Sequence, residues 1–153
     1  MFLIALKRYL GYNKVNKNFG GKAMNSKAIY WLELCDDDLI TATALLKSGR
    51  LLHMGFFCHL IAEKALKAII ANMTDDAPPR IHDLNKLAHR CDILDELTDK
   101  QLSLLDRLTP LQIEARYPEY KEKIRATLTK QYCEQLLSET EEFLCWIKMR
   151  LGA

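Results

Sequence analysis

The sequence predicts an all-α protein, an up-and-down bundle of four main helices with one short additional helix between them. Apolar residues recur every three or four positions over several long stretches, which is the period of an amphipathic helix. Proline, glycine and aspartate separate these stretches, and no run of alternating apolar and polar residues indicates a strand. The 153 residues, 49% of them hydrophobic, suffice for one domain with a real core.

The first long helix is expected from Tyr30 to about Lys47. Its apolar residues recur at helical spacing and should face the core, namely Leu32, Cys35, Leu39, Ala42 and Leu45. Ser26 is a candidate N-cap, and Ser48-Gly49 supplies the end because glycine tolerates the left-handed conformation that closes a helix. The following turn is short, so the first two helices should form an antiparallel hairpin.

The second helix, expected from near Leu52 to near Met73, is the one around which the others should pack. It is apolar on almost every face but carries His59, Glu63 and Lys67, which lie four residues apart and therefore on one side. Glu63 precedes Lys67 in the orientation that best stabilises a helix. Two interpretations are open: this stripe is the solvated edge of a core helix, or it lines a groove between helices.

A loop and a short helix should follow. Residues 74–79 contain two adjacent prolines, which cannot continue a helix. Apolar residues then return at helical spacing, namely Leu84, Leu87, Ala88 and Cys91. Either Asp83 or His82 would cap this short helix.

Capping signals mark the remaining helices. Thr98-Asp99-Lys100-Gln101 has the form of a capping box and should begin a helix that is kinked or restarted at Pro110. Pro118 should end it, because the residue before a proline is pushed out of helical geometry. The last helix is expected from about Thr129 to Arg150. Its inner face is apolar and comprises Cys133, Leu136, Leu137, Phe143, Leu144 and Ile147.

The composition argues against several classes of function. Basic and acidic residues nearly balance, 22 against 20, so no strong overall field favours nucleic acid or a membrane surface. The five cysteines contain no Cys-x-x-Cys pair, which is typical of a reduced, intracellular protein. His82 and His89 form no recurrent zinc pattern with Cys91, so we predict no metal site and no cofactor.

Residues 1–23 differ from the rest of the chain because they contain five basic residues and no acidic one. The apolar run at the start is too short to cross a bilayer, and its basic residues follow it, which is the reverse of a secretory signal. We therefore expect a cytoplasmic protein without a membrane span. We interpret 1–23 as a basic appendage, or as upstream sequence foreign to the native protein, and 24–153 as the helical domain. An arm that contacts RNA or a membrane surface is the alternative.

Several segments, taken in order, are similar to those of a known family. They are Trp31, Asp38-Leu39, Ala44-Leu45-Leu46, Gly49, His59, Glu63-Lys64-Ala65-Leu66-Lys67-Ala68, Pro79, His82-Asp83-Leu84, Leu87 and Ala115-Arg116-Tyr117-Pro118. Over roughly residues 28–150 this ordered set resembles the HEPN family (higher eukaryotes and prokaryotes nucleotide-binding). The resemblance implies a helical bundle, usually a homodimer, and often the partner of a separate minimal nucleotidyltransferase, including in toxin–antitoxin pairs.

Catalytic members of that family are ribonucleases marked by an arginine, four to six residues and then a histidine. Arg116 stands in the place of that arginine, but lysine and glutamate occupy 121–123, where the histidine is needed. Metal-free RNA cleavage needs a group that exchanges protons near neutral pH, for which imidazole is suited and lysine is not. The sequence therefore argues against nuclease activity.

The candidate ligand-binding residues combine the stripe of the second helix with two later segments. They are His59, Glu63, Lys67, His82, Asp83, Arg116 and Tyr117. Cations suit phosphate, an aromatic ring suits a base, and carboxylates accept from ribose or amine groups. Structural alternatives exist for each: His82 and Asp83 cap a helix, Tyr117 anchors the core, and Arg116 pairs with Glu63 or Glu119.

Three functions are compatible with these residues. The first is a nucleotide-binding or partner-binding module, the non-catalytic companion of a minimal nucleotidyltransferase. The second is a metal-independent ribonuclease toxin in which His59 and His82 divide the acid and base roles while Arg116 holds phosphate. The third is a purely structural dimerisation subunit.

Overall fold

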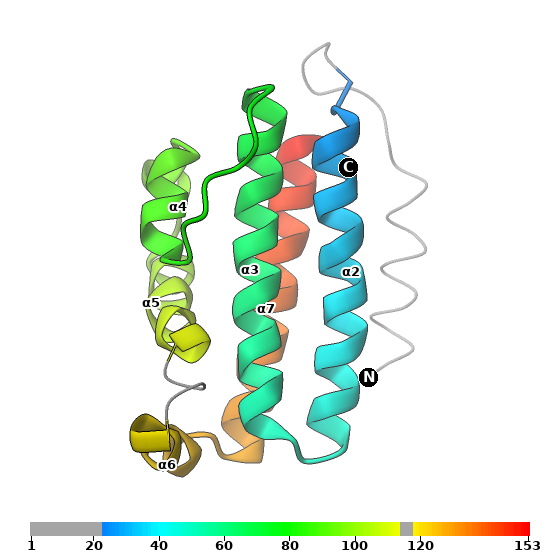
Figure 1. Ribbon diagram of the computed structural model, residues 1–153. Coiled ribbons are helices and arrows are strands. Elements are labelled where there is room, and N and C mark those ends of the chain that lie inside the picture. The colour runs from blue at the N-terminus through cyan, green and yellow to red at the C-terminus, as the bar shows by residue number, and fades with distance from the viewer. Residues whose placement is uncertain (1–22, 114–117) are drawn as a thin grey trace.

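One helix lies at the centre of the fold, which a computed structural model describes for residues 23–113 and 118–153. The described residues form six α-helices and a 3₁₀ turn: α2 (Ser26–Lys47), α3 (Leu51–Met73), α4 (Leu84–Arg90), η1 (Leu94–Glu96), α5 (Asp99–Ile113), α6 (Pro118–Thr127) and α7 (Lys130–Leu151). Figure 1 shows α3 between two groups, with α2 and α7 on one side and α4 and α5 on the other. The all-α prediction is confirmed, since these two ranges contain no strand.

The hairpin of α2 and α3 follows from the turn that connects them. Gly49 has φ +73°, a conformation that residues with a Cβ rarely adopt. Its N–H donates to the carbonyl of Leu46 at 3.1 Å, and the N–H of Arg50 donates to Leu45 at 2.9 Å. These bonds satisfy the last carbonyls of α2 and reverse the chain. The predicted end of the first helix at Ser48-Gly49 is therefore confirmed.

The N-cap of α2 is Asn25, not Ser26 as the sequence suggested. The Asn25 side-chain oxygen accepts from the N–H of Ala28 at 2.8 Å, and its amide nitrogen donates to the carbonyl of Ala71. Its own N–H donates to the side chain of Asn72 at 3.0 Å. Asparagine caps a helix as well as serine does, and here it also ties the start of α2 to the end of α3.

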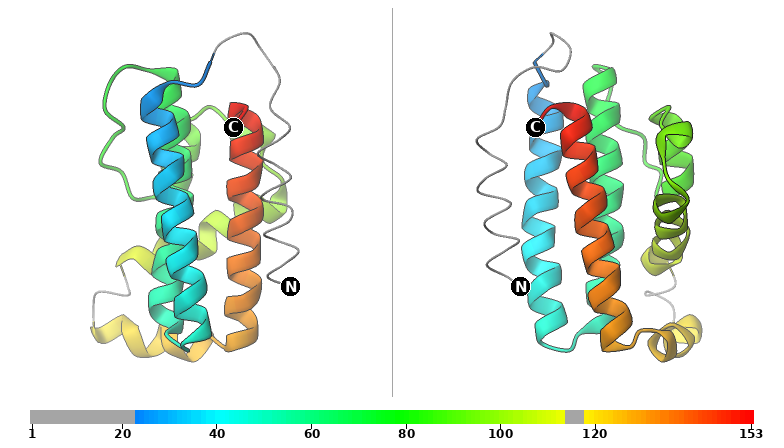
Figure 2. Two further views of the ribbon diagram at one scale, coloured as in Figure 1. Left: turned by 90° about the vertical axis from the view of Figure 1, so that its right-hand side faces the viewer. Right: turned by 180° about the vertical axis from the view of Figure 1, so that it is seen from behind.

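Two prolines were predicted to interrupt helices. Pro110 lies inside α5, so the predicted restart there is wrong, and the alternative of a kink stays a prediction. Its missing N–H would have bonded the carbonyl of Asp106, an exposed residue whose carbonyl water can solvate. Pro118 begins a further helix, α6, which the sequence analysis missed and which lies across one end of the bundle (Figure 2). Proline suits the first position of a helix because the N–H there has no helical partner.

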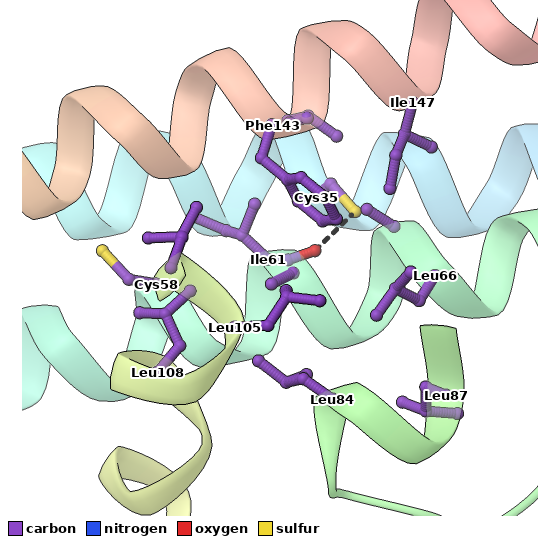
Figure 3. Close-up of a cluster of buried hydrophobic side chains, with 14 of the residues drawn as sticks. Cys35, Cys58, Ile61, Leu66, Leu84, Leu87, Leu105, Leu108, Phe143 and Ile147 are labelled. Atoms are coloured by element: carbon purple, nitrogen blue, oxygen red, sulfur yellow. Dashed lines mark hydrogen bonds between the residues drawn. The ribbon is translucent and has the colours of Figure 1, made fainter. Parts of the chain in front are cut away.

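The core lies along both flanks of α3. Figure 3 shows Leu84, Leu87, Leu105 and Leu108 on one flank of α3, with Phe143 and Ile147 of α7 on the other. Four cysteines are buried among these side chains, namely Cys35, Cys58, Cys91 and Cys133. Burial raises the pKa of the thiols of Cys58 and Cys91 to about 12, so they stay protonated and behave as small apolar groups.

Among residues 23–113 and 118–153, no helix is both long enough and apolar enough to span a bilayer.

The two candidate caps of α2 can be compared directly. We expect Asn25→Ala to lower the free energy of unfolding by about 1–2 kcal/mol, because it removes the cap and the side-chain bond to Ala71 of α3. We expect Ser26→Ala to change it by less than about 0.5 kcal/mol, since Ser26 is exposed. Urea unfolding followed by circular dichroism measures both, and equal effects would contradict the assignment of Asn25.

Candidate functional site

The polar stripe of α3 is buried. His59 is 0% exposed, Glu63 5% and Lys67 7%, although glutamate and lysine are seldom buried without partners. Of the two interpretations that the sequence left open, the solvated edge is therefore wrong and the stripe lies between helices. Together with His82, which contacts Glu63, these residues form a group that we call the Glu63 cluster.

His59 is held at both ring nitrogens. Nδ1 lies 3.0 Å from the carbonyl oxygen of Leu108 in α5, and Nε2 lies 3.0 Å from Oε2 of Glu63. A carbonyl oxygen and an ionised carboxylate can only accept, so both bonds form together only when the ring carries two protons. In that form His59 and Lys67 contribute two positive charges against the single negative charge of Glu63.

Close packing of α3 and α5 makes the contact of His59 with α5 achievable. Gly55 lies one turn before His59 in α3 and faces Leu111 of α5. A Cβ on Gly55 would lie only 3.1 Å from Cδ1 of Leu111. The absent side chain thus allows α5 to approach, and the carbonyl of Leu108 comes within reach of the imidazole.

The carboxylate of Glu63 is the centre of the cluster. Oε1 accepts from the ammonium of Lys67 at 2.6 Å, and both oxygens accept from Nδ1 of His82, at 3.1 and 3.2 Å. Burial by itself would raise the pKa of Glu63, but the bonds from His59, Lys67 and His82 outweigh it. The pKa falls from 4.5 to about 2, so the side chain is ionised at neutral pH.

Trp31 of α2 contacts the Glu63 cluster through Lys67. The Lys67 ammonium lies 5.8 Å from the centre of the Trp31 ring, and the indole is half-buried against the core. This is a cation–π arrangement, which favours a charged lysine. In the sequence, Trp31 belongs only to the set of segments that carries the family resemblance. Nothing in the sequence around Trp31 indicates its contact with Lys67, because that contact depends on how α2 packs against α3.

His82 and Asp83 are neighbours in sequence, but His82 belongs to the Glu63 cluster and Asp83 caps α4. His82 contacts Glu63 while its side chain stays 53% exposed, so it is the open edge of the cluster. Asp83 caps α4: its Oδ1 accepts from the N–H of Lys86 at 3.0 Å, and Oδ2 lies 3.7 Å from the Lys86 ammonium. The capping alternative is confirmed for Asp83, and a ligand contact by this residue stays a prediction.

Two of the predicted site residues, Arg116 and Tyr117, lie outside the described residues. Gln112 precedes Arg116 by four residues in the sequence and is 5% exposed. Its side-chain oxygen is buried and has no hydrogen-bond partner within the part of the chain that the structure describes. Buried acceptors are nearly always paired, so this oxygen marks a place where a donor is needed. No motif in the sequence pointed to it.

The arrangement limits what the cluster can do chemically. His59 is fully buried with both nitrogens engaged, so it cannot exchange a proton with a substrate outside the core. A shallow groove lies beside the cluster between α4 and α5, and none of the four cluster residues lines it. Among the described side chains there is no group of three or more acidic, histidine or cysteine residues arranged to hold a metal ion.

The low pKa of Glu63 predicts a specific acid sensitivity. A carboxyl group with a lowered pKa stabilises the fold fully above its unfolded pKa of 4.5 and loses that contribution as the pH falls toward about 2. The contribution is about 3 kcal/mol. We expect Glu63→Gln to lower the free energy of unfolding at pH 7 by about 3–5 kcal/mol, since it leaves buried cations unpaired.

Urea unfolding between pH 2 and pH 7 tests this. The matched control is Glu142→Gln, because Glu142 pairs with Lys100 on the exposed surface, and it should cost less than about 1 kcal/mol. The difference between wild type and Glu63→Gln should shrink below pH 4.5. A constant difference over the whole range would contradict the assignment.

Comparison with known proteins identifies the family. The sequence matches the HEPN domain over residues 28–150, which includes most of the described bundle. The crystal structure of TT1696 from Thermus thermophilus has a similar fold, with a TM-score of 0.70 at 20% identity over 83% of this chain and 100% of that one. A search of curated proteins gives no match. The extent of the family match shows that this chain belongs to the HEPN domain family.

Proposed function

We propose that this chain is a non-catalytic HEPN module that binds a nucleotide, with a phosphate held at the open edge of the Glu63 cluster. The observation that carries the proposal is the buried carboxylate of Glu63, which gathers His59, Lys67 and His82 around one point. With both bonds of His59 formed, the cluster has more positive than negative charge. An anion at its edge would balance that excess in a poorly solvated place.

His82 is the residue through which a ligand would reach the cluster. Its Nδ1 is engaged with Glu63, and in the described ranges its Nε2 has no hydrogen-bond partner. Because the side chain is half-exposed, Nε2 can donate to a phosphate oxygen from outside. Lys67 acts indirectly, since its ammonium is bound to Glu63 and almost fully covered.

Arg116 and Tyr117 complete the proposed site. Arginine suits phosphate because its planar group forms two parallel bonds, and a tyrosine ring suits a nucleobase. Gln112 supports this placement, since its buried oxygen accepts from no donor among the described residues and Arg116 follows it by four residues in the sequence. In this proposal Gln112 orients the guanidinium toward the phosphate.

The proposal extends to partners through the family resemblance. The chain would form a homodimer and act as the companion of a minimal nucleotidyltransferase, in a two-component arrangement such as a toxin–antitoxin pair. Co-purification from the native host tests this without choosing a partner beforehand. Recovery of a nucleotidyltransferase would support the companion role, and recovery of the chain alone would count against it.

Nucleotide titration tests the ligand site. We expect ATP or GTP at ten times the dissociation constant to stabilise the chain by about 1.4 kcal/mol, which raises Tm by roughly 3–6 °C. The informative variant is His82→Asn, whose amide keeps a donor for Glu63 but lacks the outer nitrogen. It should weaken binding about tenfold or more, because a bond to a charged group is worth about 1.5–3 kcal/mol.

His53→Ala is the matched control, since His53 is exposed in the first turn of α3 and should leave binding unchanged. If neither nucleotide gives heat in calorimetry or shifts the melting temperature, the ligand site is wrong and the chain is a structural dimerisation subunit.

A ribonuclease is the second candidate, because His59 and His82 both contact Glu63 and so lie near one another. The buried position of His59 argues against it, as only His82 can reach a substrate. We therefore expect the purified chain to leave total RNA intact over hours at pH 7 in the presence of a chelator. Cleavage by the wild type that is lost in His82→Asn and kept in His53→Ala would support the enzyme instead.

A further inference from the structure

The side of α2 that faces away from the bundle carries large apolar side chains. Tyr30 is 59% exposed and Ile40 is 70% exposed, while Glu33 and Asp37 lie between them at helical spacing. We call these four residues the outer stripe of α2. Figures 1 and 2 show α3 and α7 beside this helix, and the buried residues of α2, among them Leu32, Cys35 and Ala42, lie on its opposite side by their helical spacing.

The acids of the outer stripe differ from the other acids of α2. Asp36 pairs with Lys148 of α7 at 2.6 Å, and Asp38 pairs with Lys64 of α3 at 2.5 Å. Glu33 and Asp37 form no ion pair with any residue in 23–113 or 118–153. The stripe therefore offers apolar surface and two negative charges to something beyond the described bundle.

A second copy of the same surface is a poor occupant. If two α2 helices met about a two-fold axis, the Glu33–Asp37 region of one would face that of the other, because such an interface pairs a patch with itself. Like charges at short distance disfavour the contact. The stripe instead suits a segment that combines apolar and basic residues.

We propose that residues 1–22 of this chain are that segment and that they dock on the outer stripe of α2. They contain Lys7, Arg8, Lys14, Lys17 and Lys22 and no acidic residue, so their charge is complementary to Glu33 and Asp37. They also contain apolar residues for Tyr30 and Ile40, namely Phe2, Leu3, Ile4, Leu6, Tyr9 and Leu10. The docking surface in α2 and the complementary segment 1–22 are separate stretches of the sequence.

The segment is long enough to extend along the whole outer stripe. From Ser26 to Ile40 the axis of α2 rises about 21 Å. Seventeen residues, the number from 6 to 22, span about 25 Å even at the compact helical rise. Gly20 and Gly21 lie just before α2 and accept the backbone conformations that a reversal of direction requires. Because the segment is covalently joined to α2, its effective concentration at the stripe is in the millimolar range. A weak contact therefore suffices.

Spin labelling of the full chain tests the docking. Ala5→Cys provides the label site in a Cys145→Ser background, because Cys145 is the exposed cysteine among those described and the other four are buried. We expect a nitroxide at residue 5 to broaden the amide signals of Tyr30–Ile40 and to leave those of α6 sharp. Uniform sharpness in α2 would overturn the proposal.

Two variants separate docking from chance proximity. Tyr30→Asp with Ile40→Asp should abolish the broadening, since it removes the apolar contact and adds like charge. Tyr120→Asp is the control, because Tyr120 is an exposed aromatic residue that belongs to α6 and not to α2. Broadening that survives the double variant would also overturn the proposal.

Mixing decides whether the contact is within one chain. Spin-labelled chain without ¹⁵N is added to ¹⁵N-labelled chain without the spin label, and broadening in this mixture would mean docking on a second copy, which overturns docking within the chain. Trypsin gives an independent measure: cleavage after Lys14 and Lys17 should be about tenfold slower than in a peptide of residues 1–22 if the segment is docked nine-tenths of the time. Equal rates would contradict docking. The result does not depend on the proposed nucleotide site, since none of the residues assigned to that site belongs to α2.

Discussion

A single buried carboxylate constrains the arrangement of this bundle. Glu63 is ionised in a core of leucine, isoleucine and cysteine, and an uncompensated charge there would be costly. Its compensation comes from the side chains of His59, Lys67 and His82. Through them α3 is connected to the carbonyl of Leu108 in α5 and to the segment before α4. The geometry of the core and the ionisation of Glu63 therefore depend on one another.

Replacing such a group by apolar residues of similar size is often neutral or even stabilising, so stability alone does not require it. The cluster instead fixes how α5 is placed against α3. Leucines on α3 and α5 could pack in several registers, whereas His59 reaches the Leu108 carbonyl in one. The half-exposed ring of His82 then takes a fixed orientation from Glu63. The proposed nucleotide site depends on this orientation, because the His82 ring has to present its outer nitrogen to the ligand.

Much of the fold follows from periodicity and capping residues. The limits of α2, α3 and α7 were predicted within a few residues, because long amphipathic patterns and signals such as Gly49 and Thr129 act locally. Helix α6 was missed because Pro118 was interpreted only as a stop, although the same residue favours the first position of a helix. A proline can follow the end of one helix or occupy the first position of another, and the packing of the chain determines which of the two forms.

The site was only partly predictable. Spacing placed His59, Glu63 and Lys67 on one side of a helix. It did not indicate whether that side faces solvent or another helix, and charged residues usually face solvent. The Leu108 carbonyl and the Trp31 ring become partners only when α5 and α2 are packed against α3. A main-chain carbonyl has no signature in sequence, and neither does the side-chain oxygen of Gln112, which has no partner among the described residues.

The central place of α3 has a consequence for biosynthesis. This helix leaves the ribosome directly after α2, yet one of its flanks is covered by α7, which is made after all the other described helices. Until α7 has been made, that apolar flank has no native cover, and a nascent chain in this state is a natural client for chaperones. Premature termination before α7 should therefore yield insoluble fragments instead of a smaller stable bundle.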